Sequence, residues 1–318
     1  MSVVNTDQAY IWVMGSITPK ILVVGATGRT GSATVSALTS LPNPPKILAL
    51  TRSPSSPKAK SLLSSATSFI TLVEGNPEDP IPIFAAHSPI SAMYLVTLPP
   101  ADEAQAIPLI DAAIANSVSH IVFSSVDRGG DDASWENPTA VPHFAAKHRV
   151  ELHLRDKARG TATRWTILRP TGFMDNYGPS AGAMGPVMGG LWATMPRDRK
   201  MQLVSARDIG LLAARALMDG PGGEWANRTL GLAGDEISFA EAEEAFQRVV
   251  GRTIPRTWGG VGRVVRWAFE DAGKSMEWFE GEGYKANIEN LRVIEPRLQT
   301  WEAWLREISG WVKDDEDE

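Results

Sequence analysis

The chain has 318 residues, of which 43% are hydrophobic and 21% are charged, a composition typical of one large globular domain or two modest ones. It contains no cysteine, which excludes a disulfide scaffold, a thiolate metal site and a cysteine nucleophile. The formal net charge is -6, and the last five residues, 314–318, are all acidic. The rest of the chain is therefore close to neutral and offers no basic surface for nucleic acid.

No apolar run approaches the length of a membrane span. Residues 1–18 carry no positive charge ahead of their apolar stretch, so they are interpreted as a leader to the first strand and not as a secretion signal. We therefore expect a cytoplasmic protein with no membrane partner, and the absence of cysteine fits a reducing compartment.

Short apolar runs alternate with helical patterns through the first half of the chain. Strands are predicted at residues 20–25, 46–51, 68–74, 91–97, 119–124 and 164–169, and helices at 30–41, 57–65, 102–116 and 142–159. This alternation predicts the α/β class, with a doubly wound parallel sheet covered by helices on both faces. After Pro170 the pattern changes to loop and short helix over 171–200, a helix over 204–217, and a mostly helical chain from 237.

Three glycines, Gly25, Gly28 and Gly31, follow directly on the first buried strand and open the first helix. In a dinucleotide-binding loop the first glycine permits a tight turn, the second admits the pyrophosphate, and the third lets helix and strand pack closely. The helix N-terminus then holds the phosphate charge. Because the strand and helix context is also present, the segment predicts a dinucleotide site that includes Thr27, Arg29 and Thr30.

The second strand indicates which dinucleotide is bound. An acidic residue at its end would take the ribose hydroxyls of NAD, but this strand ends with Thr51, Arg52 and Ser53. The guanidinium of Arg52 matches a 2'-phosphate, and Arg29 could add a second positive contact. The predicted cofactor is therefore NADP(H).

These segments resemble the NmrA-like family, an atypical branch of the short-chain dehydrogenase/reductase superfamily with a Rossmann fold. Besides the glycine loop and Arg52, five segments carry the resemblance, in order along the chain: Val73–Asp79, His143–Lys147, Arg169–Asn176, Ala206–Gly210 and Asn227–Asp235. The resemblance covers about residues 20–255. It implies a Rossmann-type domain that binds NADP(H) and a small C-terminal domain that forms a cleft beside the nicotinamide.

The resemblance also implies a domain division and a set of contacts. We expect a leader (1–18), a nucleotide-binding domain (19–175 with contributions from 201–235), a smaller, mostly helical cap (176–200 and 236–313) and an acidic tail (314–318). Asn76 would lie near the adenine, although the usual family residue there is aspartate. Residues at the ends of the fourth, fifth and sixth strands would line the nicotinamide side: Thr97, Leu98, Pro99, Ser124, Pro170, Thr171, Gly172 and Phe173.

Typical short-chain reductases have a tyrosine proton donor four residues before a lysine, and here these positions are His143 and Lys147. Lys147 would bind the cofactor ribose and orient the nicotinamide. The proton would come from His143, or from a tyrosine of the cleft such as Tyr177, or no proton is transferred and His143 only packs at the helix start. Ser125 could hydrogen-bond the substrate or satisfy a turn.

No metal site is predicted, because histidines at 143, 148 and 153 rotate around the helix and cysteine is absent. Trp301, Trp304, Leu305 and Ile308 are spaced as a packed helix face. Trp258, Trp267, Trp278 and Phe279 are expected to fill the core of the cap, with the alternative that they cover an aromatic substrate.

The predicted function is an NADPH-dependent oxidoreductase that reduces a small apolar or aromatic carbonyl, imine or enone. Two alternatives stay open. One is a non-catalytic NADP(H)-binding redox sensor or regulator that acts through a protein partner, which the missing tyrosine favours. The other is a non-redox isomerase or cyclase on the same fold.

Overall fold

The computed structural model describes residues 18–63, 68–257 and 259–312. Residues 1–17 of the leader, the acidic tail, Trp258 and the end of the predicted helix 57–65 lie outside the described residues. None of the helices in the described part of the chain combines the length and the apolar character needed to cross a membrane.

The first layer is a seven-stranded sheet in which every neighbouring pair is parallel. Its spatial order is β3-β2-β1-β4-β5-β6-β9. The strands are β1 (Lys20–Val23), β2 (Lys46–Thr51), β3 (Ile70–Glu74), β4 (Ala92–Val96), β5 (His120–Ser124), β6 (Arg164–Pro170) and β9 (Arg228–Leu232). The order reverses between β1 and β4, so the edge of the sheet at their carboxyl ends is where open α/β sheets bind ligands. The predicted doubly wound α/β fold is confirmed.

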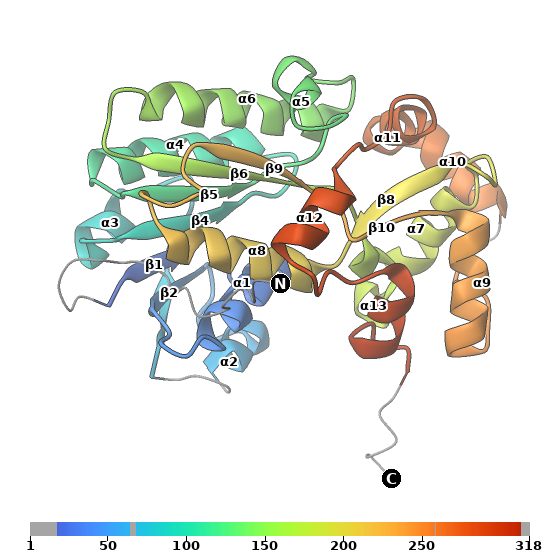
Figure 1. Ribbon diagram of the computed structural model, residues 1–318, viewed down its shortest axis with the longest axis horizontal. Coiled ribbons are helices and arrows are strands. Elements are labelled where there is room, and N and C mark those ends of the chain that lie inside the picture. The colour runs from blue at the N-terminus through green and yellow to red at the C-terminus, as the bar shows by residue number, and fades with distance from the viewer. Residues whose placement is uncertain (1–17, 64–67, 258, 313–318) are drawn as a thin grey trace, which may run out of the picture.

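Helices cover both faces of this sheet (Figure 1). One face packs α1 (Arg29–Thr39) and α8 (Ala206–Asp219), and the other packs α3 (Ile81–His87), α4 (Asp102–Ala115) and α6 (Pro142–Ala158). Successive side chains of β1 point to opposite faces of the sheet. Ile21 and Val23 therefore pack in the core on the first face, and Leu22 packs in the core on the second. Two short helices, α2 (Pro57–Leu63) and α5 (Ala133–Glu136), lie in connecting segments.

A second, three-stranded sheet lies beyond the carboxyl edge of the large one, in the order β10-β8-β7 (Figure 1). It contains β7 (Gly172–Phe173), β8 (Lys200–Val204) and β10 (Asp235–Ser238). The sequence did not predict this sheet, because β7 has two residues and β8 lies where the predicted loop region 171–200 meets the predicted helix 204–217. β10 pairs antiparallel with β8 across more than thirty residues of chain, so no local hairpin signal marks the pair.

The cap around this sheet is mostly helical. It contains α7 (Met184–Trp192), α9 (Phe239–Val250), α10 (Gly259–Ala268), α11 (Glu270–Gly281), α12 (Ile288–Ile294), α13 (Trp301–Glu307) and 3-10 turns at Met174–Tyr177 and Pro179–Ala181. Its core contains Trp301, Trp304 and Leu305 as predicted, whereas Ile308 at the end of the same helix is exposed. Trp278 is buried, but Trp267 is 88% exposed and therefore does not fill the core.

Candidate functional site

The glycine loop joins β1 to α1, and its three glycines meet three different constraints. Gly25 has a φ of +72°, and a Cβ there would lie 2.7 Å from Cγ1 of Val96 on β4. A Cβ on Gly31 would lie 2.1 Å from the carbonyl oxygen of Gly25, so only glycine lets α1 pack against the loop. Gly28 is exposed at the N-terminus of α1, where no side chain caps the helix and the first turn has no acidic residue. This end of α1 therefore suits an external anion.

Gly31→Ala is expected to lower the free energy of unfolding by roughly 1–3 kcal/mol, because the added methyl group must push the helix away from the loop backbone. Urea denaturation measures this loss. Gly222→Ala is the matched control, since a Cβ there meets no atom within 4 Å. Equal stability of the two variants would contradict the close packing inferred for Gly31.

Arg52 and Asn76 lie at the same edge of the sheet, just beyond the ends of two paired strands. Thr51 pairs with Glu74, and the Gly75 amide donates to the Thr51 carbonyl at 3.2 Å. Arg52 is exposed, and no side chain in the described part of the chain pairs with its guanidinium. Asn76 is also exposed, and its Oδ1 accepts from the Glu78 amide at 3.2 Å. Both side chains are thus accessible to a ligand lying across β2 and β3.

Arg29, unlike Arg52, already has a side-chain partner, and that partner belongs to the cap. Arg29 is exposed at the start of α1, and its Nη1 donates to Oδ1 of Asn176 in the first 3-10 turn of the cap. Asp175, beside it, accepts from the Ala206 amide at the N-terminus of α8. The glycine loop is therefore linked to the segment that follows β7, across the edge of the large sheet.

Lys147 belongs to a buried polar cluster at the ends of β4 and β5. Its Nζ lies 3.1 Å from Oγ1 of Thr97 and 3.1 Å from Oδ1 of Asp102, and 5.6 Å from the ring centroid of Phe123. Burial lowers the pKa of Lys147, and the neighbouring Asp102 opposes that shift. Asp102 is itself fully buried, and its Oδ2 has no hydrogen-bond partner among the described residues. An ammonium group has three donors, so one of them is left for a ligand.

The other residues expected near a nicotinamide follow the carboxyl ends of β4, β5 and β6. Ser124 and Ser125 are buried, and Ser125 Oγ accepts from Arg128 at 3.4 Å. The Thr171 hydroxyl donates to the Leu232 carbonyl at 3.0 Å, so it is already occupied. Leu98 is exposed beside Pro99, whereas Pro170 is buried and Gly172 and Phe173 form β7. The structure thus brings these segments to one edge.

His143 stands in the first turn of α6, one helical turn before Lys147. Its Nδ1 lies 2.8 Å from the carboxylate of Asp271 in α11, and its backbone amide lies 3.4 Å from Oδ2 of the same residue. The hydrogen bond with His143 is the main cause that lowers the pKa of Asp271. Asp271 was not predictable from the sequence, because 128 residues separate it from its partner and it stands in a helix with many charged residues.

Tyr177 does not lie in the cleft, which corrects its prediction as a candidate proton donor. It is buried in the core of the cap, with its ring centroid 4.9 Å from that of Trp192 and 5.6 Å from that of Trp301. Burial raises the pKa of its hydroxyl. The physical reason is that the 3-10 turn after β7 directs this ring into the aromatic core.

Tyr284, which was not among the predicted site residues, packs against Phe144, the residue that follows His143. Its ring centroid lies 6.4 Å from that of Phe144 and 5.1 Å from that of Trp278, and its Cε2 would lie 3.8 Å from a Cβ on Gly172. Phe144, Trp278, Phe279 and Tyr284 form an aromatic cluster beside His143. No signal in the sequence marks Tyr284, because it stands in an irregular segment after α11.

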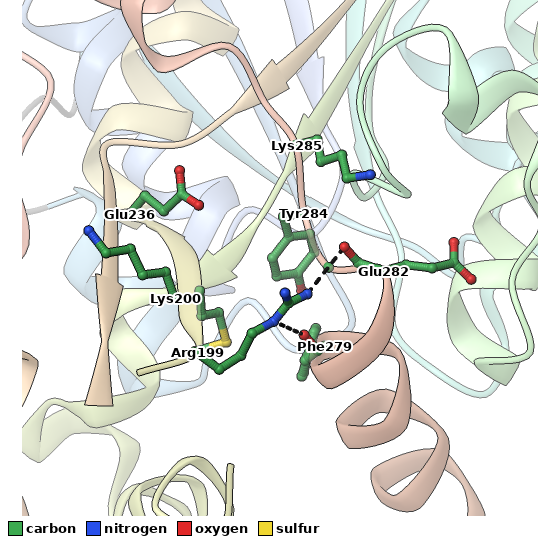
Figure 2. A pocket seen from close by; sticks show the side chains of 9 residues that line it. Arg199, Lys200, Glu236, Phe279, Glu282, Tyr284 and Lys285 are labelled. Carbon is green, nitrogen blue, oxygen red and sulfur yellow. Dashed lines mark hydrogen bonds between the residues drawn. The ribbon is translucent and has the colours of Figure 1, made fainter. Parts of the chain in front are cut away.

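Tyr284 also lines a cavity of about 180 Å³ between the small sheet and the C-terminus of α11 (Figure 2). Arg199 crosses this cavity and donates to the carbonyl oxygens of Phe279 at 2.9 Å and Glu282 at 3.3 Å. The Arg199 guanidinium therefore satisfies carbonyl oxygens at the C-terminus of α11, and these donors are not available to a ligand. Within the described ranges, no three histidine or acidic side chains are grouped to hold a metal ion.

The model of the NmrA-like family matches residues 18–305. No curated protein matches the sequence significantly. The fold is similar to that of NmrA, a negative transcriptional regulator, in complex with NADP, with a TM-score of 0.68 and 20% identity over 92% of this chain and 96% of that one.

Two reductases have slightly lower TM-scores and identities. An NADPH-dependent quinone oxidoreductase from Escherichia coli, complexed with NADPH, has a TM-score of 0.66 and 18% identity over 90% of this chain and 98% of that one. A triphenylmethane reductase from Citrobacter sp., complexed with NADP(H), has the same TM-score, identity and coverage. At these identities the structural similarities show the fold alone, whereas the family match covers most of the sequence. The chain belongs to the NmrA-like family.

Proposed function

We propose that this protein is an NADPH-dependent oxidoreductase that reduces a small apolar or aromatic carbonyl, imine or enone. The observation that carries the proposal is the placement of His143 and Lys147 one turn apart on α6. This end of α6 adjoins the carboxyl edge of a sheet whose glycine loop suits a dinucleotide. Cofactor-bound relatives of both reductase and regulator type support the cofactor assignment.

In this proposal residues 19–175, with 201–235, hold NADP(H). The pyrophosphate would lie on Gly25–Gly31, the 2'-phosphate on Arg52, and the adenine beside Asn76. The cap formed by 176–200 and 236–313 would cover the nicotinamide side. The uncapped start of α1 and the free guanidinium of Arg52 support this placement, since both provide donors for phosphate oxygens.

When bound, the nicotinamide supplies two electrons and a hydrogen to an electrophilic carbon of the substrate. Lys147 would donate its remaining N–H to the ribose, while Thr97 and Asp102 hold the ammonium group in place. His143 would give a proton to the substrate atom that takes up the negative charge. Ser125, at the end of β5, would be close to the same substrate atom.

The aromatic cluster beside His143 supports an apolar or aromatic substrate. Phe144 contacts the His143 ring at a centroid distance of 4.5 Å, and Trp278 and Tyr284 pack against Phe144. Phe144 and Trp278 are buried, whereas Phe279 and Tyr284 are only partly buried and can offer their rings to a ligand. Aromatic rings bind planar apolar molecules better than sugars or phosphate esters. The names of two relatives, a quinone oxidoreductase and a triphenylmethane reductase, are consistent with this class.

Titration with NADPH and NADH, followed by tryptophan fluorescence, tests the cofactor assignment. NADPH is expected to bind more tightly than NADH, because Arg52 pairs with the 2'-phosphate. Arg52→Ala is expected to weaken NADPH binding by about 1.5–3 kcal/mol, the usual strength of hydrogen bonds to charged groups, and to leave NADH binding unchanged. The two affinities would then be nearly equal.

Arg159→Ala is the matched control, because Arg159 is also exposed but follows α6 at the opposite edge of the sheet. It should keep the preference for NADPH. A chain that binds neither nucleotide would overturn the cofactor assignment and the whole reductase proposal. With binding established, the oxidation of NADPH by menadione, a triphenylmethane dye and cyclohexenone tests turnover.

A regulator that binds NADP(H) without turnover is the second candidate, and one feature of the surface favours it. Val264, Trp267 and Phe269 are all exposed around the end of α10, which is more apolar surface than a surface helix usually shows. A protein partner could cover them. Tight NADPH binding without oxidation by any acceptor, together with loss of a partner in Trp267→Ser, would favour the regulator.

A further inference from the structure

The imidazole of His143 is held by a carboxylate that comes from the cap. Nδ1 of His143 lies 2.8 Å from the Asp271 carboxylate, and the backbone amide of His143 approaches the same side chain at 3.4 Å. None of the described residues forms a hydrogen bond with the other ring nitrogen, Nε2. One nitrogen is thus fixed by the protein and the other is available to a ligand.

Asp271 is itself held in place by its own helix and by an apolar contact nearby. The Ser275 hydroxyl donates to the Asp271 carbonyl at 2.7 Å. About two turns after Asp271 in α11, Trp278 packs edge-on against Phe144, the residue that follows His143. The ring centroids are 5.2 Å apart. The α6–α11 contact therefore combines an apolar anchor with the His143–Asp271 pair, and the anchor keeps the Asp271 position of α11 beside His143.

We propose that Asp271 is a positioning residue, which fixes the tautomer and the ring orientation of His143 so that Nε2 is the nitrogen that transfers the proton. This inference rests on the proposed reductase function. In the step, the Nε2–H bond of the imidazolium breaks and an O–H or N–H bond forms on the reduced substrate. The imidazole is left neutral with its Nδ1–H still bonded to Asp271, and a proton from solvent restores the acid.

The charge state of Asp271 agrees with this role. Its pKa is lowered, chiefly by the hydrogen bond to His143, so the carboxylate is ionised at neutral pH and can accept a proton donor on Nδ1. An ionised carboxylate can only accept a hydrogen bond, so it requires the hydrogen on Nδ1. A neutral amide acceptor would keep the ring orientation but would make a weaker hydrogen bond.

A second pair on the same helix provides a matched comparison. His153 Nε2 lies 2.9 Å from Asp111 in α4, and the side chains are 21% and 42% exposed, against 24% and 48% for His143 and Asp271. The two pairs are thus alike in distance and exposure. The two pairs differ in their distance from the candidate site. His153 stands more than two turns further along α6, away from the carboxyl edge of the sheet.

The experiment compares the full-length wild type with Asp271→Ala, Asp271→Asn and Asp111→Ala, with His143→Gln to assign the ring signals. Nitrogen NMR shifts above pH 8 report which ring nitrogen of His143 carries the hydrogen. The kcat for NADPH oxidation with the best acceptor and the Kd for NADPH are measured in parallel. Asp271→Ala is expected to lose the Nδ1–H tautomer and to lower kcat about tenfold to a hundredfold with an unchanged Kd.

Asp271→Asn, which can still accept from Nδ1–H, is expected to retain the tautomer and to recover part of kcat. Asp111→Ala should leave both readouts as in the wild type. A wild-type kcat in Asp271→Ala, or a tautomer that does not change, would overturn the positioning role while leaving the reductase function standing. A wild type that binds NADPH but reduces no acceptor would overturn the reductase function, and the acid role of the pair with it.

Discussion

Glu151→Gln is expected to lower the free energy of unfolding by about 3–5 kcal/mol. Glu151 is fully buried, and both of its oxygens accept hydrogen bonds from two arginines that are also fully buried. Arg128 approaches Oε2 at 2.8 Å and Oε1 at 3.1 Å, and Arg169 approaches them at 2.8 and 3.2 Å. Without the carboxylate, two guanidinium charges would remain buried beside each other. Urea denaturation of both proteins at neutral pH measures the difference.

The matched control is Glu103→Gln. Glu103 pairs with Arg149 through two hydrogen bonds of 2.7 and 2.9 Å, the same bidentate geometry, but the two side chains are partly exposed to solvent. An exposed pair contributes about 0.2–1 kcal/mol, so this variant should stay within that range. Equal losses in the two variants would show that the buried arginines find other partners, or that water reaches them.

The buried cluster also fixes the helix that carries the candidate site. Glu151 follows Lys147 by one turn of α6, while Arg128 stands in the loop after β5 and Arg169 at the end of β6. Arg128 further donates to the Asn137 carbonyl at 3.0 Å and the Ser134 carbonyl at 2.6 Å, which holds the loop before α6. Glu151→Gln should therefore weaken the support of His143 and Lys147 as well as overall stability.

The strands and helices of the large sheet could be predicted from the sequence because their signals are local. An apolar run such as 119–124 is buried on both faces in β5, and a helical period such as 102–116 becomes α4. The glycine loop was predictable for the same reason, since a positive φ at Gly25 and close backbone contacts at Gly28 and Gly31 favour glycine at three fixed positions.

The features that were missed depend on contacts between distant parts of the chain. β8 is strand-like because Gly172–Phe173 and Asp235–Ser238 pair with it, and neither segment is near it in sequence. Asp271 stands among charged residues of α11, and only the docking of that helix on α6 gives it a histidine partner. Tyr177 was placed in the cleft from its position after the sixth strand, but the packing of Trp192 and Trp301 decides where its ring lies.

His120 is expected to make the protein sensitive to acid. Its ring is fully buried in β5, where Nε2 lies 2.8 Å from the Thr166 hydroxyl and Nδ1 has no partner in the part of the chain that the structure describes. Burial lowers the pKa of His120 from 6.5 to about 4, because the charged imidazolium would lose its hydration. The unfolded chain keeps the ordinary histidine pKa and so takes up the proton first as the pH falls.

The stabilisation from neutral His120 is therefore complete above pH 6.5 and is lost as the pH falls from there to about 4. At about 1.36 kcal/mol per pKa unit, the loss over this window is roughly 3 kcal/mol. The free energy of unfolding of the wild type and of His120→Asn, measured by urea denaturation at pH 7 and pH 4, isolates this contribution.

The comparison uses the change with pH and not the absolute stability, so a constant cost of replacing the buried ring cancels. Carboxyl groups that titrate in the same window contribute equally to both proteins and cancel as well. His120→Asn should lose roughly 3 kcal/mol less than the wild type between the two pH values. Equal losses would mean that His120 is protonated inside the folded protein, and that a partner such as Thr166 or an internal water molecule stabilises its charge.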